Sequence, residues 1–165
     1  MSSPSVTEGE AVFDVPQAGK PCKTWYEIHG DVTPRSGICP LVLIHGGPGI
    51  PSNYMIPITE LASLRDIPVV RYDQVGCGKS TRLSEKMGDV SFWTVDLFLD
   101  ELDNLLRHLD IQDNYCLLGQ SWGGMLLSCH AVRQPKDLKK AIISNSPTDI
   151  ATSYAITTGC ARHVE

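Results

Sequence analysis

Short apolar runs alternate with longer amphipathic segments along most of this 165-residue chain. Four short runs are predicted to be strands buried on both faces of a sheet, and the first of them is wholly apolar and lies between Pro40 and Gly46. They span residues 41–44, 67–72, 115–118 and 138–144. Two earlier segments, 11–15 and 23–29, alternate well enough to be strands joined by a turn, after a loose polar lead-in over residues 1–10.

Helical periodicity is clearest over residues 92–109, where apolar side chains recur at three- and four-residue steps. The acidic residues of this segment fall mainly off the apolar stripe, and we expect all of them in solvent: Asp96, Asp100, Glu101 and Asp103. Two more helices are predicted over residues 52–64 and 122–133. Strands that alternate with helices at this spacing predict an α/β fold, with a mostly parallel sheet and helices on both faces.

Composition and charge narrow the function classes. With 42% hydrophobic and 20% charged residues, the chain has the composition of a globular domain. Its net charge of −5 argues against a nucleic-acid-binding surface, which needs a basic stripe. No apolar run reaches the roughly 18 residues of a membrane span, and the acidic start has no apolar centre typical of a secretory signal. We therefore expect a cytoplasmic protein that binds neither nucleic acid nor membrane.

The six cysteines are widely and irregularly spaced, with no CxxC pair. This spacing predicts neither a zinc site nor a dense disulfide framework, so we expect reduced thiols and no metal. Cys116 and Cys129 fall inside apolar patterns and are predicted to be small buried hydrophobic residues.

The strongest chemical signal is the segment Gly119-Gln120-Ser121-Trp122-Gly123. It lies between an apolar run and a predicted helix, and this strand–turn–helix context is typical of a nucleophile elbow. The serine must occupy a sharp turn that exposes its hydroxyl, so the flanking residues must be small. We predict that Ser121 is the nucleophile and that the backbone N–H of Trp122, at the helix start, faces a developing oxyanion.

A second motif, His45-Gly46-Gly47-Pro48-Gly49, follows the apolar run 41–44. The loop after this strand supplies the other oxyanion donor in folds with a nucleophile elbow, and glycines there let a substrate approach the backbone. We predict the N–H of Gly47 as that donor, with Gly46 as the second candidate.

Together with the segment from Asp73 to Ser80, these motifs closely resemble the proline iminopeptidase family, and most of all its fungal members described as proline iminopeptidases or amino-acid amidases. The resemblance runs from about Glu8 to Pro147. It implies an α/β-hydrolase domain with a helical cap that releases an N-terminal residue, often proline, from a small peptide or amide. It also implies a structural role for Asp73 and its loop, and no cofactor.

The acid and histidine of a triad follow the serine after later strands in this fold. Only about forty residues follow Ser121, so we expect the cap, the last strands and both partners to be missing. Residues 1–147 would then form the N-terminal half of an α/β-hydrolase core, and residues 148–165 a divergent tail. His130 lies too far along its helix to act as the base. His45 is predicted to be a structural imidazole.

Two alternatives remain open at this point. An esterase or lactonase would share the same fold and nucleophile but take a different substrate. A non-catalytic truncated form would act only as a binding module, and an incomplete sheet would leave an exposed edge through which copies of the chain could associate.

Overall fold

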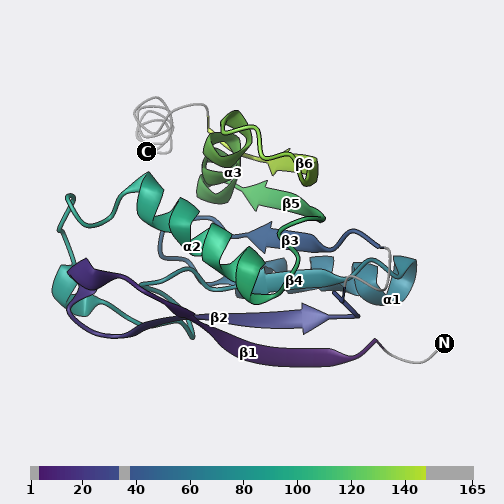
Figure 1. The fold of residues 1–165 in the computed structure, drawn as a ribbon, viewed down its shortest axis with the longest axis horizontal. Helices are drawn as coiled ribbons and strands as arrows, with labels where there is room; N and C mark the ends of the chain where they lie inside the picture. The colour runs from purple at the N-terminus through teal and green to yellow at the C-terminus, as the bar shows by residue number, and fades with distance from the viewer. Residues whose placement is uncertain (1–3, 34–37, 148–165) are drawn as a thin grey trace, which may run out of the picture.

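The computed structural model describes residues 4–33 and 38–147. They form one six-stranded sheet in the order β1-β2-β4-β3-β5-β6 (Figure 1). The strands are β1 (Val6–Phe13), β2 (Cys22–His29), β3 (Leu41–Ile44), β4 (Val69–Tyr72), β5 (Tyr115–Gln120) and β6 (Leu138–Ser144). The first two pair as an antiparallel hairpin and β2 also runs antiparallel to β4, whereas β4, β3, β5 and β6 are parallel. The predicted α/β class with a mostly parallel sheet is confirmed.

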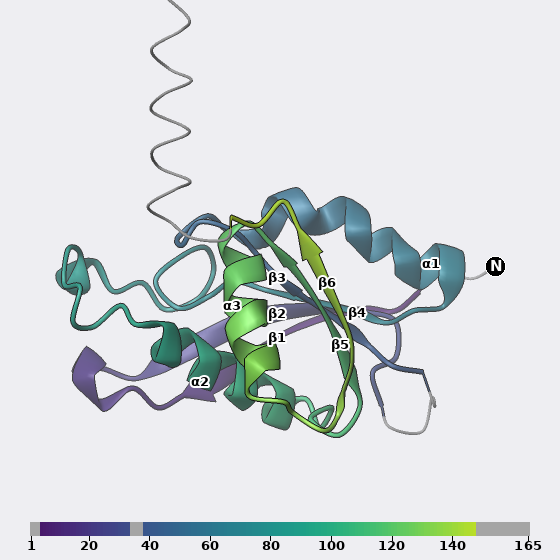
Figure 2. The same cartoon turned by 90° about the horizontal axis from the view of Figure 1, so that it is seen from above.

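Helices cover both faces of this sheet (Figure 2). One face carries α2 (Val95–His108) and α3 (Trp122–Val132), and the other carries the 3₁₀ segment η3 (Ser52–Glu60) with α1 (Leu61–Arg65). Alternate side chains of the central strands face the two layers. Val42 and Ile44 pack into the larger core under α2 and α3, whereas Leu41 and Leu43 join the smaller core around Met55.

Two elements differ most from the sequence prediction, β1 in its start and the segment after the glycine loop in its type of helix. Strand β1 begins at Val6, because residues 6–10, which were predicted to be part of a loose polar lead-in, pair one by one with β2. The helix expected over residues 52–64 is a 3₁₀ segment followed by one short α-helix. Pro57 lies inside η3, where proline lacks the N–H that an α-helix needs, so the chain takes the tighter turn. Two shorter 3₁₀ turns are η1 (Pro16–Ala18) and η4 (Ser84–Lys86).

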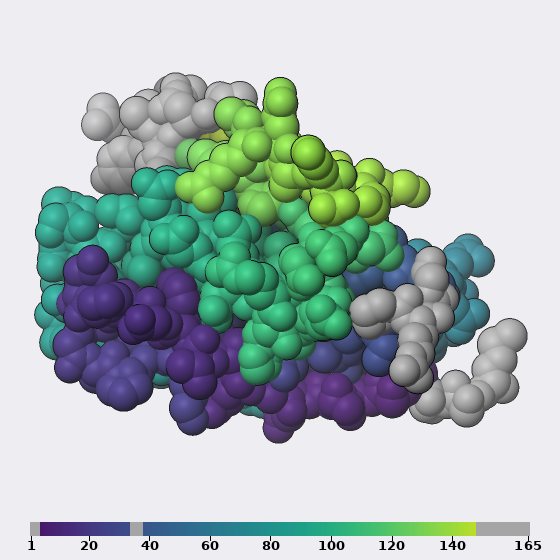
Figure 3. All heavy atoms as spheres, in the orientation of Figure 1, coloured from purple at the N-terminus to yellow at the C-terminus, as the bar shows by residue number. Residues whose placement is uncertain are grey.

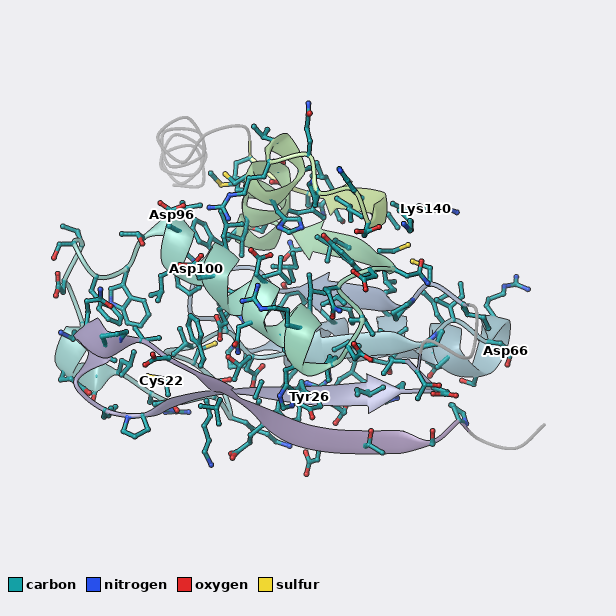
Figure 4. The ribbon with its side chains drawn as sticks, viewed as in Figure 1. Cys22, Tyr26, Asp66, Asp96, Asp100 and Lys140 are labelled. Carbon is teal, nitrogen blue, oxygen red and sulfur yellow. The ribbon has the colours of Figure 1, made fainter. Side chains whose placement is uncertain are left out.

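The prediction that residues 138–144 form a buried strand is wrong in its burial. β6 is a strand, but among the described residues it pairs only with β5 and forms the edge of the sheet opposite β1. Ile142 and Ile143 are 46% and 55% exposed, and Lys140 points away from the sheet (Figure 4). In the space-filling view β6 and α3 form the upper margin of the molecule (Figure 3). The sequence pattern therefore predicted the strand correctly but not the solvent exposure of its side chains.

Glu101 also departs from its prediction. Asp96 and Asp100 lie on the outer side of α2 in solvent, as expected (Figure 4). Glu101 is fully buried, and its Oε1 accepts hydrogen bonds from the Thr24 hydroxyl and from the N–H of Val75 at 2.8 Å. Cys129, predicted to be buried, is exposed.

Candidate active site

Ser121 occupies a strained turn between β5 and α3. Its φ of 55° and ψ of −120° lie outside the regions that a residue with a β-carbon normally adopts, as the elbow prediction requires. The side chain is partly exposed and caps no helix N–H. Within the part of the chain that the structure describes, the Ser121 hydroxyl has no hydrogen-bond partner. It is therefore free to engage a substrate and a base.

Close packing of backbone holds this turn. A β-carbon at Gly123 would overlap the carbonyl oxygen of Ile44, and one at Gly119 would overlap the carbonyl of Gly123. Helix α3 thus rests directly on the end of β3, and no larger residue fits at either glycine. Gly124 makes room for the Ser146 side chain, since a β-carbon there would lie 2.6 Å from the β-carbon of Ser146.

The segment around β6 also anchors the elbow. The Ser121 N–H donates to the carbonyl of Ser144 at 3.0 Å, and the Ser146 hydroxyl donates to the carbonyl of Ser121 at 3.0 Å. These two bonds fix both peptide groups of the strained residue. Ser146 lies beyond the strand pattern and within no motif, so sequence reasoning did not identify it.

The glycine loop after β3 lies beside Ser121. A β-carbon at Gly46 would lie 3.2 Å from the β-carbon of Ser121. The Gly46 N–H, however, donates to the Tyr54 hydroxyl at 2.7 Å, and that hydroxyl donates to Oε1 of Gln120 at 2.7 Å. Tyr54 was not identified from the sequence, because its position in η3 carries no motif. Its bonds occupy the donor of Gly46 and tie the loop to the elbow.

Gly47 has the geometry that only glycine adopts comfortably. Its φ is 122°, and a β-carbon would lie 2.6 Å from the backbone nitrogen of Gly49. Neither Gly47 nor Trp122 donates its N–H to another described residue, and the N–H of Trp122 belongs to the unpaired first turn of α3. The N–H groups of Gly47 and Trp122 thus have no partner among the described residues, whereas the donor of Gly46 is occupied.

His45 is a buried structural imidazole. Its Nδ1 lies 2.8 Å from the Gly46 carbonyl, so it carries the proton, and its Nε2 accepts the N–H of Gln74 at 2.9 Å. Burial lowers the pKa of His45, which keeps the ring neutral. Gln74 in turn donates to the His45 carbonyl at 3.2 Å and accepts the indole N–H of Trp122 at 3.1 Å. The ring therefore joins the glycine loop after β3 to the loop after β4 by hydrogen bonds.

Asp73 organises the loop after β4. Its Oδ1 accepts the N–H and hydroxyl of Ser52 at 2.8 and 2.7 Å, and its Oδ2 accepts the N–H of Lys79 at 2.9 Å. A β-carbon at Gly78 would overlap this carboxylate. The Ser80 hydroxyl donates to the carbonyl of Asp73. All acceptor groups of the buried aspartate are thus used within the fold.

No histidine of residues 4–33 and 38–147 reaches the Ser121 hydroxyl by a hydrogen bond. His130 is buried 2.8 Å from the Tyr115 hydroxyl, and burial lowers its pKa. His29 contacts Glu27 and His108 contacts Tyr26. His163 lies outside the described residues, as does the predicted tail over residues 148–165.

The described residues contain neither a metal-binding cluster nor a membrane-spanning helix. No group of three or more histidine, cysteine, aspartate or glutamate side chains in the described part of the chain is arranged to hold a metal ion. None of the helices within it is both long and apolar enough to span a bilayer.

Comparison with known proteins agrees with this architecture. Residues 40–158 match the family described as alpha/beta hydrolase fold, and the chain belongs to that family. Within it, the chain is 39% identical over 142 residues to a proline iminopeptidase of Clostridioides difficile and 38% identical over 125 residues to one of Lactiplantibacillus plantarum. These alignments cover 86% and 75% of the chain but only 44% and 41% of the relatives. The chain therefore spans less than half of their length.

Solved structures give the same result. The proline iminopeptidase of Mycobacterium smegmatis superposes with a TM-score of 0.79 at 35% identity, covering 96% of this chain and 50% of that one. VinJ superposes with a TM-score of 0.75 at 47% identity, covering 87% of this chain and 45% of that one.

Proposed function

We propose that this chain carries the nucleophile and oxyanion hole of a serine hydrolase of the proline iminopeptidase type. The observation that carries the proposal is the elbow itself. Ser121 stands at a strained turn with a hydroxyl that has no partner among the described residues, beside the glycine loop, and the N–H groups of Gly47 and Trp122 also have no described partner. Such a constellation serves acyl transfer, since it presents a nucleophile next to two donors for the negative charge that forms on the attacked carbonyl.

The reaction follows from these positions. The Ser121 oxygen attacks the carbonyl of the scissile bond, and its proton passes to a histidine base. The N–H groups of Gly47 and Trp122 stabilise the oxyanion, and the histidine returns the proton to the amine as the scissile C–N bond breaks. Water, deprotonated by the same histidine, then attacks the acyl-enzyme and releases the acid and the Ser121 hydroxyl. The described residues place no base at Ser121, so this step depends on a group beyond them. The reaction uses no metal or organic cofactor.

The substrate class comes from the relatives. The relatives from Clostridioides difficile and Lactiplantibacillus plantarum are named proline iminopeptidases, which supports hydrolysis of an N-terminal residue, often proline, from small peptides or amides. An esterase or lactonase would use the same nucleophile and donors. The two activities differ in turnover of an amide against an ester.

The test compares wild-type protein with Ser121→Ala on a fluorogenic prolyl amide and on a butyrate ester. We expect weak amide turnover, about 10⁴-fold below that of the Clostridioides difficile relative, because no described residue acts as a base at Ser121 and a serine without its triad base loses about this much. Ser121→Ala should abolish the turnover that remains. Turnover that survives this substitution would contradict the proposal, and ester turnover well above amide turnover would favour the esterase.

Gly47→Val tests the donor assignment, with Gly49→Ala as the matched control. Both positions have positive φ, but a β-carbon at Gly47 would clash with the backbone whereas one at Gly49 meets no atom within 4 Å. We expect Gly47→Val to lower kcat by about 10²–10³, with a smaller change in KM, because the donor acts on charge that develops during the reaction. Equal effects of the two substitutions would contradict the assignment.

One observation favours a second function, that of a binding module without catalysis. Among the described residues, no base contacts the Ser121 hydroxyl. If the prolyl amide binds with the same affinity to wild-type protein and to Ser121→Ala, and neither turns it over, this second function is the correct one.

A further inference from the structure

A cavity of about 570 Å³ lies next to the glycine loop. Pro48 and Gly49 form one wall, directly after the proposed donor Gly47. The rest of the lining comes from the long segment between β4 and α2, which lies at the carboxyl ends of the parallel strands (Figure 1), and from Phe98 in the first turn of α2. Ligands of open α/β sheets bind at this edge. The cavity is therefore continuous with the loop that carries the catalytic donor.

Aromatic side chains form a firm apolar wall in this cavity. Trp93 stacks on Phe98 with ring centroids 6.0 Å apart, and Phe98 meets the Trp122 ring edge to face at 5.7 Å. A β-carbon at Gly76 would lie 2.6 Å from the Trp93 ring, so the indole rests directly against the backbone there. These contacts connect the cavity wall to the elbow helix and hold it in a fixed orientation.

Arg82 is the only charged residue among those that line the cavity. Its one hydrogen bond is a 3.4 Å contact to the carbonyl of Gly78, and no described carboxylate forms an ion pair with it. The nearest acids along this segment have other partners. Glu85 pairs with Lys20 at 2.8 Å, and Asp89 accepts the hydroxyl of Ser91 at 2.6 Å. The cavity thus combines an apolar wall with an unneutralised guanidinium.

We propose that this cavity binds the leaving group of a short peptide, with an apolar side chain against Trp93 and Phe98 and the terminal carboxylate at Arg82. The inference rests on the proposed function for the orientation of the peptide. The residue released by an aminopeptidase carries a free amine, a cation that Arg82 would repel. Only the leaving side of a di- or tripeptide ends in an anion. The substrate class is therefore short peptides with an apolar residue after the scissile bond.

The experiment measures binding, so it needs no catalysis. Titration calorimetry of the whole chain would compare 3-phenylpropionate with its neutral analogue 3-phenylpropionamide. We expect millimolar affinity for the carboxylate, a level typical of so small a ligand. Arg82→Gln should weaken 3-phenylpropionate about fivefold, the upper range for an exposed ion pair, and leave the amide unchanged. Arg107→Gln removes the same charge from the exposed end of α2, outside the cavity, and should change neither.

A charge reversal at Met87 gives an independent measurement. Met87 lines the cavity and is 84% exposed, so Met87→Glu should fold normally and weaken 3-phenylpropionate by repelling its charge. The inference is overturned if neither probe binds, if both bind equally, or if Arg107→Gln has the same effect as Arg82→Gln. Any of these results can occur while Ser121→Ala still abolishes turnover, so this inference can fail without the proposed function. If turnover survived Ser121→Ala while binding of 3-phenylpropionate still depended on Arg82, the proposed function would fail and this inference would stand.

Discussion

Glu101→Gln should make the protein more stable at neutral and mildly alkaline pH. The carboxyl is fully buried, and burial raises its pKa to about 8, against the lowering effect of the bonds from Thr24 and Val75. Its second oxygen, Oε2, has no partner among the described residues. Near pH 5 the folded protein therefore holds this proton, and above pH 8 it must bury a charge. Glutamine keeps the shape and the acceptor without the ionisation.

The magnitude follows from proton linkage. The folded pKa lies above the unfolded value of 4.5, so stability is fully present below pH 4.5 and is lost as pH rises toward 8. Each pH unit well inside this window costs about 1.4 kcal/mol, and less near its ends, which amounts to about 3 kcal/mol between pH 5 and 7.5. That is a large part of the stability of a small domain.

Urea unfolding followed by tryptophan fluorescence from pH 5 to 8 measures this effect. The difference in unfolding free energy between Glu101→Gln and wild type should grow with pH in favour of the variant. His45 and His130 titrate in both proteins and cancel from this difference. Asp100→Asn, an exposed neighbour on α2, is the matched control and should show no such trend. A difference that stays constant with pH would refute the reasoning.

Three further outcomes follow from single contacts. Tyr54→Phe removes the hydroxyl that accepts the Gly46 N–H, so we expect a loss of about 1 kcal/mol in urea unfolding, and an unchanged midpoint would contradict this contact. The Cys39 and Cys116 sulfurs lie 2.8 Å apart, so diamide should convert them to a disulfide, detected by peptide mass and absent in Cys39→Ser. Ile143→Lys should reduce concentration-dependent self-association at the exposed β6 edge in sedimentation velocity, whereas equal association would exclude this edge.

The elbow could be predicted from the sequence because its constraints are local. A nucleophile that stands clear of the backbone needs small neighbours, and Gly119 and Gly123 are the positions where no β-carbon fits. The apolar strands and the amphipathic α2 were likewise recognised from periodicity alone. Each of these features depends on atoms within a few residues along the chain.

Burial was harder to predict because it depends on what packs from elsewhere. Both β3 and β6 were predicted to be buried strands, but β6 contains two lysines, and among the described residues β3 has neighbours on both sides whereas β6 has only β5. Glu101 lies beside solvent-exposed acids in the sequence, but Thr24 from β2 and the loop after β4 enclose its side chain. Ser146 and Tyr54 form hydrogen bonds to residues 25 and 8 positions away in the sequence, at Ser121 and Gly46. A single side chain of this kind produces no periodic pattern that could predict its contact.

The meeting of the two motifs depends on strand order and register. β3 lies between β4 and β5, and Ile44 pairs with Gly119 across the parallel ladder. Two residues beyond that pair, the chains reach Gly46 and Ser121, which is why a β-carbon at Gly46 would lie 3.2 Å from that of Ser121. A register shift of one residue would turn the loop away from the elbow. The glycine loop can therefore serve the proposed oxyanion hole only because these two strands are neighbours.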